Sequence, residues 1–161
     1  MRSYRVRVAA VSLLLGLAAA AALAQAAGEV PYPDGYRRWV HISSGWVGEG
    51  SAAFPHFAGL HHIYANPQAM TGYRAATFPV GSVIVFDVLA TKAGPGSLTT
   101  AERRLLDVME KTADGWRFAE FNGSSHTERT VSAAAGVKAC AACHVKLGTD
   151  SVISKLGDAD G

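Results

Sequence analysis

The chain has 161 residues, with 15 Lys and Arg against 13 Asp and Glu, for a formal net charge of +2. Three of the arginines lie in residues 1–27, and without them 12 basic residues face 13 acidic ones, for a charge of −1. A nearly neutral chain without a basic run does not indicate a partner such as nucleic acid. Its length suits one domain with a hydrophobic core.

Residues 1–27 have the features of a secretory signal peptide. Three arginines precede an apolar run from Val8 to Leu23, and small residues follow it. The run is shorter than the roughly 20 residues that span a bilayer. We therefore expect residues 1–27 to be cleaved, residues 28–161 to form one exported domain, and the protein to be periplasmic. An uncleaved membrane anchor is the alternative.

The first half of the exported part alternates short elements with turns rich in glycine and proline. The predicted elements are a short helix over 36–39 with Asp34 as its N-cap, a strand over 40–44, a loop over 45–59, a strand over 61–65 and a helix from Pro67 to Arg74.

The strongest strand signal lies over 82–90, which is β-branched and nearly all apolar. Residues 103–112 fit either a helical stripe or a strand, and their position between two strands favours a strand. The remaining predictions are a turn over 113–115, an alternating strand over 116–121, a helix over 128–137 and a loose tail from Leu147. We therefore predict an α+β fold, mainly an antiparallel β-sheet with short helices.

The only two cysteines stand in the pentapeptide Cys140-Ala141-Ala142-Cys143-His144. This spacing is the attachment signal of c-type haem, in which both thiols add to haem vinyl groups and the histidine binds the iron. We predict one covalent haem c, with His144 as the metal ligand. A redox-active disulfide and a zinc site are the alternatives. The position near the chain end argues against the first, and the lack of a second ligand pair argues against the second.

Four segments followed by this pentapeptide resemble, in order, the cytochrome P-460 family, which is related to the beta-type cytochromes c-prime. The segments are Tyr36–His41, His61–Asn66, Phe78–Val85 and Gly115–Phe118. The resemblance implies a sheet-rich domain, usually a homodimer, with one haem. It also implies that the motif histidine is the proximal ligand and that the distal position is open or holds solvent.

Family members that oxidise hydroxylamine cross-link a lysine to the haem, and Phe86 stands at the matching position here. Phenylalanine cannot form that bond, and it resembles the phenylalanines that cap the distal pocket of the beta-type cytochromes c-prime. We therefore expect Phe86 to contact the haem on its distal side. Glu110 and Glu120 are the carboxylates available as a proton acceptor, although neither clearly matches the family's position.

These features predict an exported mono-haem cytochrome that binds small gases such as NO and CO or handles electrons with a redox partner protein. Phenyl groups offer no hydrogen-bond donor, which favours neutral diatomic ligands. The alternative is an enzyme, a haem-dependent oxidoreductase that acts on a nitrogenous substrate, hydroxylamine or NO.

The sequence leaves the sixth iron ligand open. Met109, or less clearly Met70, could bind the iron, although core packing is the more usual role of a methionine. His61 and His62 are adjacent and would face opposite sides of a strand, one of them buried. Arg37 or Arg38 could pair with the haem propionates.

Overall fold

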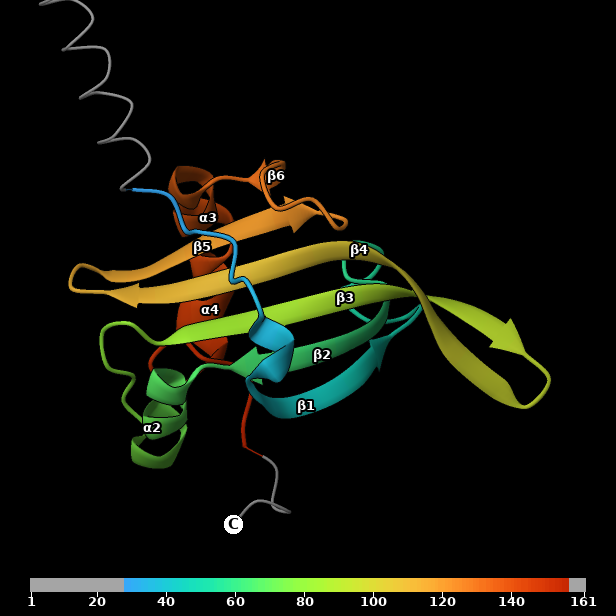
Figure 1. The fold of residues 1–161 in the computed structure, drawn as a ribbon, viewed down its shortest axis with the longest axis horizontal. Helices are drawn as coiled ribbons and strands as arrows, with labels where there is room; N and C mark the ends of the chain where they lie inside the picture. The colour runs from blue at the N-terminus through green and yellow to red at the C-terminus, as the bar shows by residue number, and fades with distance from the viewer. Residues whose placement is uncertain (1–27, 157–161) are drawn as a thin grey trace, which may run out of the picture.

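The computed structural model describes residues 28–156, so the predicted signal peptide lies outside the described residues. Six strands form one sheet in which each pairs antiparallel with the next in the chain (Figure 1). The strands are β1 (Val40–Val47), β2 (Gly59–Ala65), β3 (Val83–Gly94), β4 (Ser97–Thr112), β5 (Gly115–Asn122) and β6 (Arg129–Val131). The helices are the 3-10 helix η1 (Tyr36–Arg38), α2 (Pro67–Ala75), α3 (Ala133–Ala139) and α4 (Ala141–Leu147).

The predicted mainly antiparallel sheet with short helices is confirmed, and the ambiguous segment over 103–112 is a strand. Helix α2 begins at Pro67 as expected, and its N-cap Asn66 ties it to the sheet. The Asn66 side-chain oxygen accepts from the N–H of Ala69 at 2.8 Å and from that of Val83 at 3.1 Å. Strands β3 and β4 run beyond the predicted bounds as an exposed two-stranded arm that projects from the sheet (Figure 1).

Three local predictions are wrong. The helix expected over 128–137 begins late, because β6 pairs with β5 and α3 starts only after its N-cap Ser132. The part of the expected loose tail that is described, up to residue 156, folds back on the domain, where Thr149 pairs with Val152 and Val152 is only 4% exposed. The N-cap of η1 is Gly35, in the left-handed conformation at φ 72°, rather than Asp34.

The sheet packs on both faces, as the alternation of its side chains requires. On the face covered by α2, α3 and α4, the buried cluster includes Ile84 of β3, Met109 of β4 and Phe118 of β5. On the opposite face, the cluster includes Val85, Leu106 and Phe121 from the same three strands. The N-terminal segment covers this second face and crosses in front of the sheet in Figure 1.

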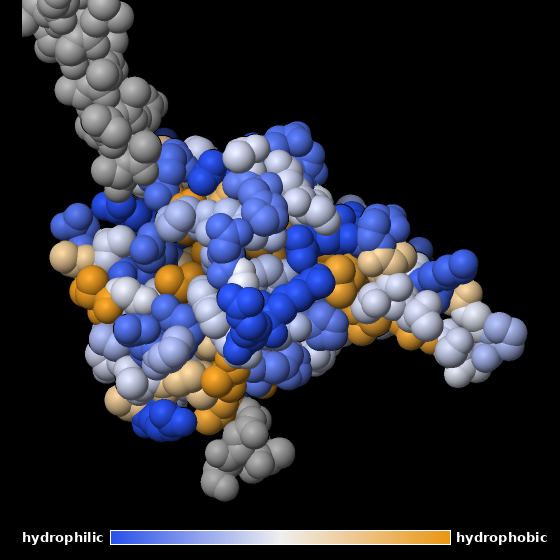
Figure 2. Space-filling view, viewed as in Figure 1, coloured by the Kyte–Doolittle hydropathy of each residue, from blue (hydrophilic) through white to orange (hydrophobic). Residues whose placement is uncertain are grey.

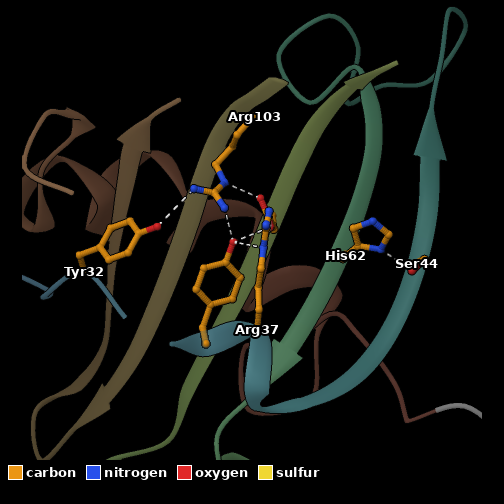
Figure 3. A network of polar contacts seen from close by, with 7 residues as sticks. Tyr32, Arg37, Ser44, His62 and Arg103 are labelled. Atoms are coloured by element: carbon orange, nitrogen blue, oxygen red, sulfur yellow. Dashed lines mark hydrogen bonds and ion pairs between the residues drawn. The ribbon is translucent and has the colours of Figure 1, made fainter. Parts of the chain in front are cut away.

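Buried Asp87 of β3 holds the N-terminal segment on the sheet. Its carboxylate accepts from Arg103 Nε at 2.7 Å, from Arg37 Nη2 at 2.9 Å and from the Tyr36 hydroxyl. Arg103 also donates to the hydroxyl of Tyr32 at 3.2 Å (Figure 3). Burial alone would raise the pKa of Asp87, but these hydrogen bonds outweigh it and lower that pKa.

Figure 2 shows the same face of the molecule as Figure 1, which is mostly hydrophilic, with apolar residues in small separate groups.

Candidate functional site

The Cys-x-x-Cys-His pentapeptide lies where α3 and α4 meet. Cys140 joins the helices with helical backbone angles, and the N–H groups of Cys143 and His144 both donate to its carbonyl oxygen at 3.1 Å. Both cysteines are free; Cys140 is half-buried and Cys143 is exposed. One helical turn therefore presents two thiols and one imidazole, the set that haem c attachment uses.

Helix α3 packs closely on β5 at Gly136. A Cβ atom on this residue would lie 2.6 Å from the carbonyl oxygen of Phe118, well inside van der Waals contact. The missing side chain is what permits this approach. Gly136 therefore sets the distance between the sheet and the helix that leads into the pentapeptide.

His144 is held in one tautomer by the chain that follows α4. Its Nδ1 lies 2.8 Å from the carbonyl oxygen of Ser151, and its ring packs against that of Phe118 with centroids 5.0 Å apart. A carbonyl oxygen only accepts hydrogen bonds, so Nδ1 carries a proton, and in the neutral ring the lone pair is on Nε2. This is the state in which an imidazole binds iron, with its other nitrogen donating to a backbone carbonyl.

Asp150 anchors the turn that carries the Ser151 carbonyl. Its carboxylate accepts from Lys111 Nζ at 2.8 Å and from the N–H of Phe78 at 2.9 Å, while its own carbonyl accepts from Trp116 Nε1 at 2.8 Å. Burial would raise the pKa of Asp150, but the bond from Lys111 and the Phe78 N–H hold it below its usual value. The carbonyl that faces His144 is thus tied to β4 and β5 through its neighbour.

A cavity of about 400 Å³ opens between the pentapeptide and the sheet. Its volume falls within the range of about 300–1,000 Å³ usual for cofactor sites. The lining is mostly apolar, and Cys140 and His144 are part of it. Other lining residues come from the loop after β1 and from β2 to β5: Phe57, His61, Ile63, Ile84, Phe86, Asp107 and Phe118. An apolar hollow lined by one free thiol and an imidazole, with a second thiol on the same helical turn, fits a haem.

Two phenylalanines and a histidine form the part of the wall that β2, β3 and the loop contribute. The rings of Phe57 and Phe86 meet edge to face at 5.4 Å, and the His61 ring stacks on Phe86 at 4.6 Å. His61 Nδ1 is buried and has no hydrogen-bond partner. Burial, with a smaller contribution from His62, lowers the pKa of His61, so its ring is neutral at pH 7. The neutral ring therefore adds aromatic surface to the wall of the cavity.

Two carboxyl groups lie beside this wall. Asp107 of β4 lines the cavity, directly opposite Phe86 on β3 and Glu120 on β5. Burial, followed by the charge of Glu120 and a hydrogen bond to it, raises the pKa of Asp107 well above its usual value. Burial and then the charges of Asp107 and Glu120 raise the pKa of Cys140 to about 11. The pair therefore lies close enough to the pentapeptide to influence its first thiol.

The other residues considered as iron or haem contacts lie in different parts of the fold. Met109 lines the cavity but is packed in the core at 7% exposure, and Met70 is buried in α2. His62 lies on the face opposite the cavity, where its Nδ1 is 2.7 Å from Ser44 Oγ (Figure 3). Arg37, one of the two arginines considered for the haem propionates, also lies on that face and is paired with Asp87.

Of the two glutamates considered from the sequence, only Glu120 is near the cavity. Glu110 lines a separate hollow with Val30 and Val83, which belong to the opposite face. No local sequence pattern singles out Phe57 or Asp107. Phe57 lies in an irregular loop, and the alternation of β4 that points Asp107 inward was not evident while 103–112 could still be a helix.

Comparisons with known proteins agree with the site. Within residues 28–156, no helix is long and apolar enough to cross a membrane. A search of curated proteins finds no match. The family described as cytochrome P-460 matches residues 33–154, which span all six strands and the pentapeptide. The chain therefore belongs to the cytochrome P-460 family, a family of haem-binding cytochromes.

Proposed function

We propose that this protein is an exported c-type cytochrome with one covalent haem that binds small neutral gases such as NO and CO. Cys140 and Cys143 would hold the haem through thioether bonds, and His144 Nε2 would be its axial ligand. Bound haem supplies an iron that coordinates diatomic ligands and exchanges one electron. Periplasmic location, a homodimer and a redox partner protein belong to the same proposal.

The observation that supports this proposal most directly is the tautomer of His144. The Ser151 carbonyl accepts from Nδ1 at 2.8 Å, which leaves Nε2 as the nitrogen that can bind iron, and His144 lines the same cavity as Cys140. The arrangement suits an imidazole that must keep a lone pair for iron.

Selectivity for neutral ligands follows from Phe57 and Phe86. Their rings pack against each other in the cavity wall, and removing the water of an anion beside them would cost several kcal/mol. His61 departs from the purely phenyl-lined pocket expected from the sequence. Its neutral ring adds a third aromatic surface beside the two phenyl groups, which also favours ligands without charge.

A haem-dependent oxidoreductase acting on hydroxylamine or NO is the second candidate. Asp107 favours it, because a carboxyl group in the cavity wall could accept a proton from such a substrate. Against it, the resemblance aligns Phe86 with the family's cross-linking lysine, and no lysine of residues 28–156 lines the cavity.

The test uses full-length protein matured in a host with haem-attachment machinery, beside the double variant C140S/C143S. Intact mass should show one added haem in the natural protein and none in the variant. The reduced protein should bind CO and NO and bind cyanide weakly. An unmodified mass, or tight cyanide binding with no CO adduct, would overturn the proposal. A reduced Soret band shifted far to the red would indicate a cross-linked haem and favour the oxidoreductase.

A further inference from the structure

A line of titratable groups connects the cavity to the surface. Asp107 lines the cavity and lies directly opposite Glu120 on β5. Glu120 is only 5% exposed, and its Oε2 lies 2.6 Å from His56 Nε2. The side chain of His56 is 57% exposed. Thus three side chains in successive contact reach from solvent to the cavity.

Asp107 and Glu120 are placed to share one proton. They face each other on β4 and β5, Asp107 lines the cavity, and Glu120 is only 5% exposed. Two negative charges held this close in a poorly solvated site repel each other, and one proton between the carboxyl groups removes that repulsion.

His56 is placed to exchange that proton with solvent. The loop that carries it is held against the sheet by Arg104, whose guanidinium donates to the carbonyl oxygens of Pro55 and Ala58. The 2.6 Å contact between His56 and Glu120 is within the range over which protons transfer directly. A histidine can accept a proton on its exposed nitrogen and release another from the buried one.

We propose that His56, Glu120 and Asp107 form a proton relay between solvent and the haem cavity. In each inward step, His56 takes a proton from water at Nδ1 and gives the proton on Nε2 to Glu120. Glu120 passes its shared proton to Asp107, and His56 returns to its starting tautomer by proton exchange with water. One proton enters at the surface and one arrives at the cavity, with no change in electron count.

Other groups around the carboxyl pair do not replace any member of the relay. The hydroxyl of Thr130 donates to Glu120 Oε1 and leaves Oε2 to His56. Arg104 is occupied by loop carbonyls, and Cys140 would be a thioether in the haem protein. The proposal rests on the proposed function only in taking the occupant of the cavity to be haem.

The relay can be tested by infrared spectroscopy of the full-length, haem-loaded protein. At pH 7 we expect the C=O stretch of one protonated carboxyl group, which shifts in D2O. It should disappear in D107N and in E120Q and remain in E128Q, a control in which an exposed glutamate is neutralised. Absence of the band from the natural protein would overturn the shared proton.

His56→Gln tests the route rather than the pair. Glutamine can still donate to Glu120 but does not pass protons on, so the band should remain while its shift in D2O becomes at least about tenfold slower. Exchange as fast as in the natural protein would overturn the relay. Because His56 is largely exposed, this variant should fold even if D107N and E120Q do not.

A second measurement links the pair to the cofactor. Removing a positive charge from the cavity by reduction favours protonation of the carboxyl pair, so the midpoint potential should fall as pH rises. D107N should lose this dependence, and a dependence equal to that of the natural protein would count against the proposal. If intact mass shows no haem, the proposed function fails, while the infrared band and its exchange still test the proton chain itself.

Discussion

His144 Nδ1 lies 2.8 Å from the carbonyl oxygen of Ser151, so the proposed iron ligand is oriented by a turn that follows its own helix. Both Asp150 and Ser151 have positive φ, at 47° and 64°, a region that non-glycine residues enter only when their surroundings hold them there. The contacts of Asp150 with Lys111, Phe78 and Trp116 supply that hold.

Asp150→Asn should therefore alter the iron as well as the fold. A weaker hold on the Ser151 carbonyl makes His144 a less basic ligand, so we expect the midpoint potential to rise, by about 59 mV for each tenfold loss of preference for the oxidised form. Lys146→Gln, an exposed charge change on α4, is the control. Spectroelectrochemical titration measures the midpoint potentials of the two variants and of the natural protein. Equal potentials in Asp150→Asn and in the control would show that the turn does not tune the ligand.

Asp87→Asn should destabilise the fold strongly. Arg103 is only 9% exposed and would lose the charge that compensates its own, a change that costs about 3–5 kcal/mol in buried pairs. Asp114→Asn, at a carboxylate that is 89% exposed and 3.9 Å from Arg117, should change stability by less than about 0.5 kcal/mol. Urea unfolding of the two variants beside the natural protein gives the comparison. Similar decreases in the free energy of unfolding of the two variants would mean that Asp87 contributes no more to stability than an exposed carboxylate.

Stability should also depend on pH through Asp87. Its pKa is lower in the folded state than the usual 3.8, so its contribution is complete above pH 3.8 and is lost as pH falls through the folded value. The natural protein should lose stability in that acid range more steeply than Asp87→Asn. Thermal unfolding followed from pH 7 downward tests this, and parallel curves would contradict it.

Asp107→Asn should have the opposite effect. The folded pKa of Asp107 is raised, so the natural protein loses stability as pH rises from 3.8 through that higher value. An asparagine at this position can donate a hydrogen bond to Glu120 and has no carboxyl group that must ionise in a buried site. We expect a higher melting temperature for the variant at pH 7 and a difference that vanishes below pH 3.8. A lower melting temperature at both pH values would contradict the raised pKa.

Phe86→Ala should open the cavity beside His61. We expect CO to bind the reduced protein about tenfold faster, which corresponds to a barrier lower by about 1.4 kcal/mol, and cyanide to bind more tightly. Phe54→Ala is the control, since Phe54 is on the same loop as Phe57 but does not line the cavity. Flash photolysis and cyanide titration measure these changes. Unchanged kinetics in Phe86→Ala would exclude Phe86 as a gate.

Local patterns predicted the strands well because their periodicity and turns are local properties. The strand over 82–90 and the alternation over 116–121 appear as β3 and β5, and the pentapeptide was evident from five residues. The late start of α3 was not evident from local sequence, because Arg129 and Val131 are held in β6 by pairing with β5.

The residues that form the cavity wall were harder to predict from the sequence. The sequence indicated that His61 and His62 face opposite sides, but which one faces the cavity depends on the register between β2 and its neighbours. Asp107 became identifiable only once β4 was known to be a strand paired with Glu120 of β5. Long-range pairing, rather than local preference, assembles this part of the site.

Strand β4 points Asp107 toward the cavity while its neighbours Leu106 and Val108 fill the core on the opposite face. Adding or deleting one residue between Arg103 and Thr112 would exchange these faces, placing leucine and valine in the cavity and a carboxylate in the opposite core. The exposed tip from Gly94 to Ser97 carries no such constraint. Length variation among natural relatives should therefore collect in the arm, which also makes its tip the suitable place to insert a tag or reporter.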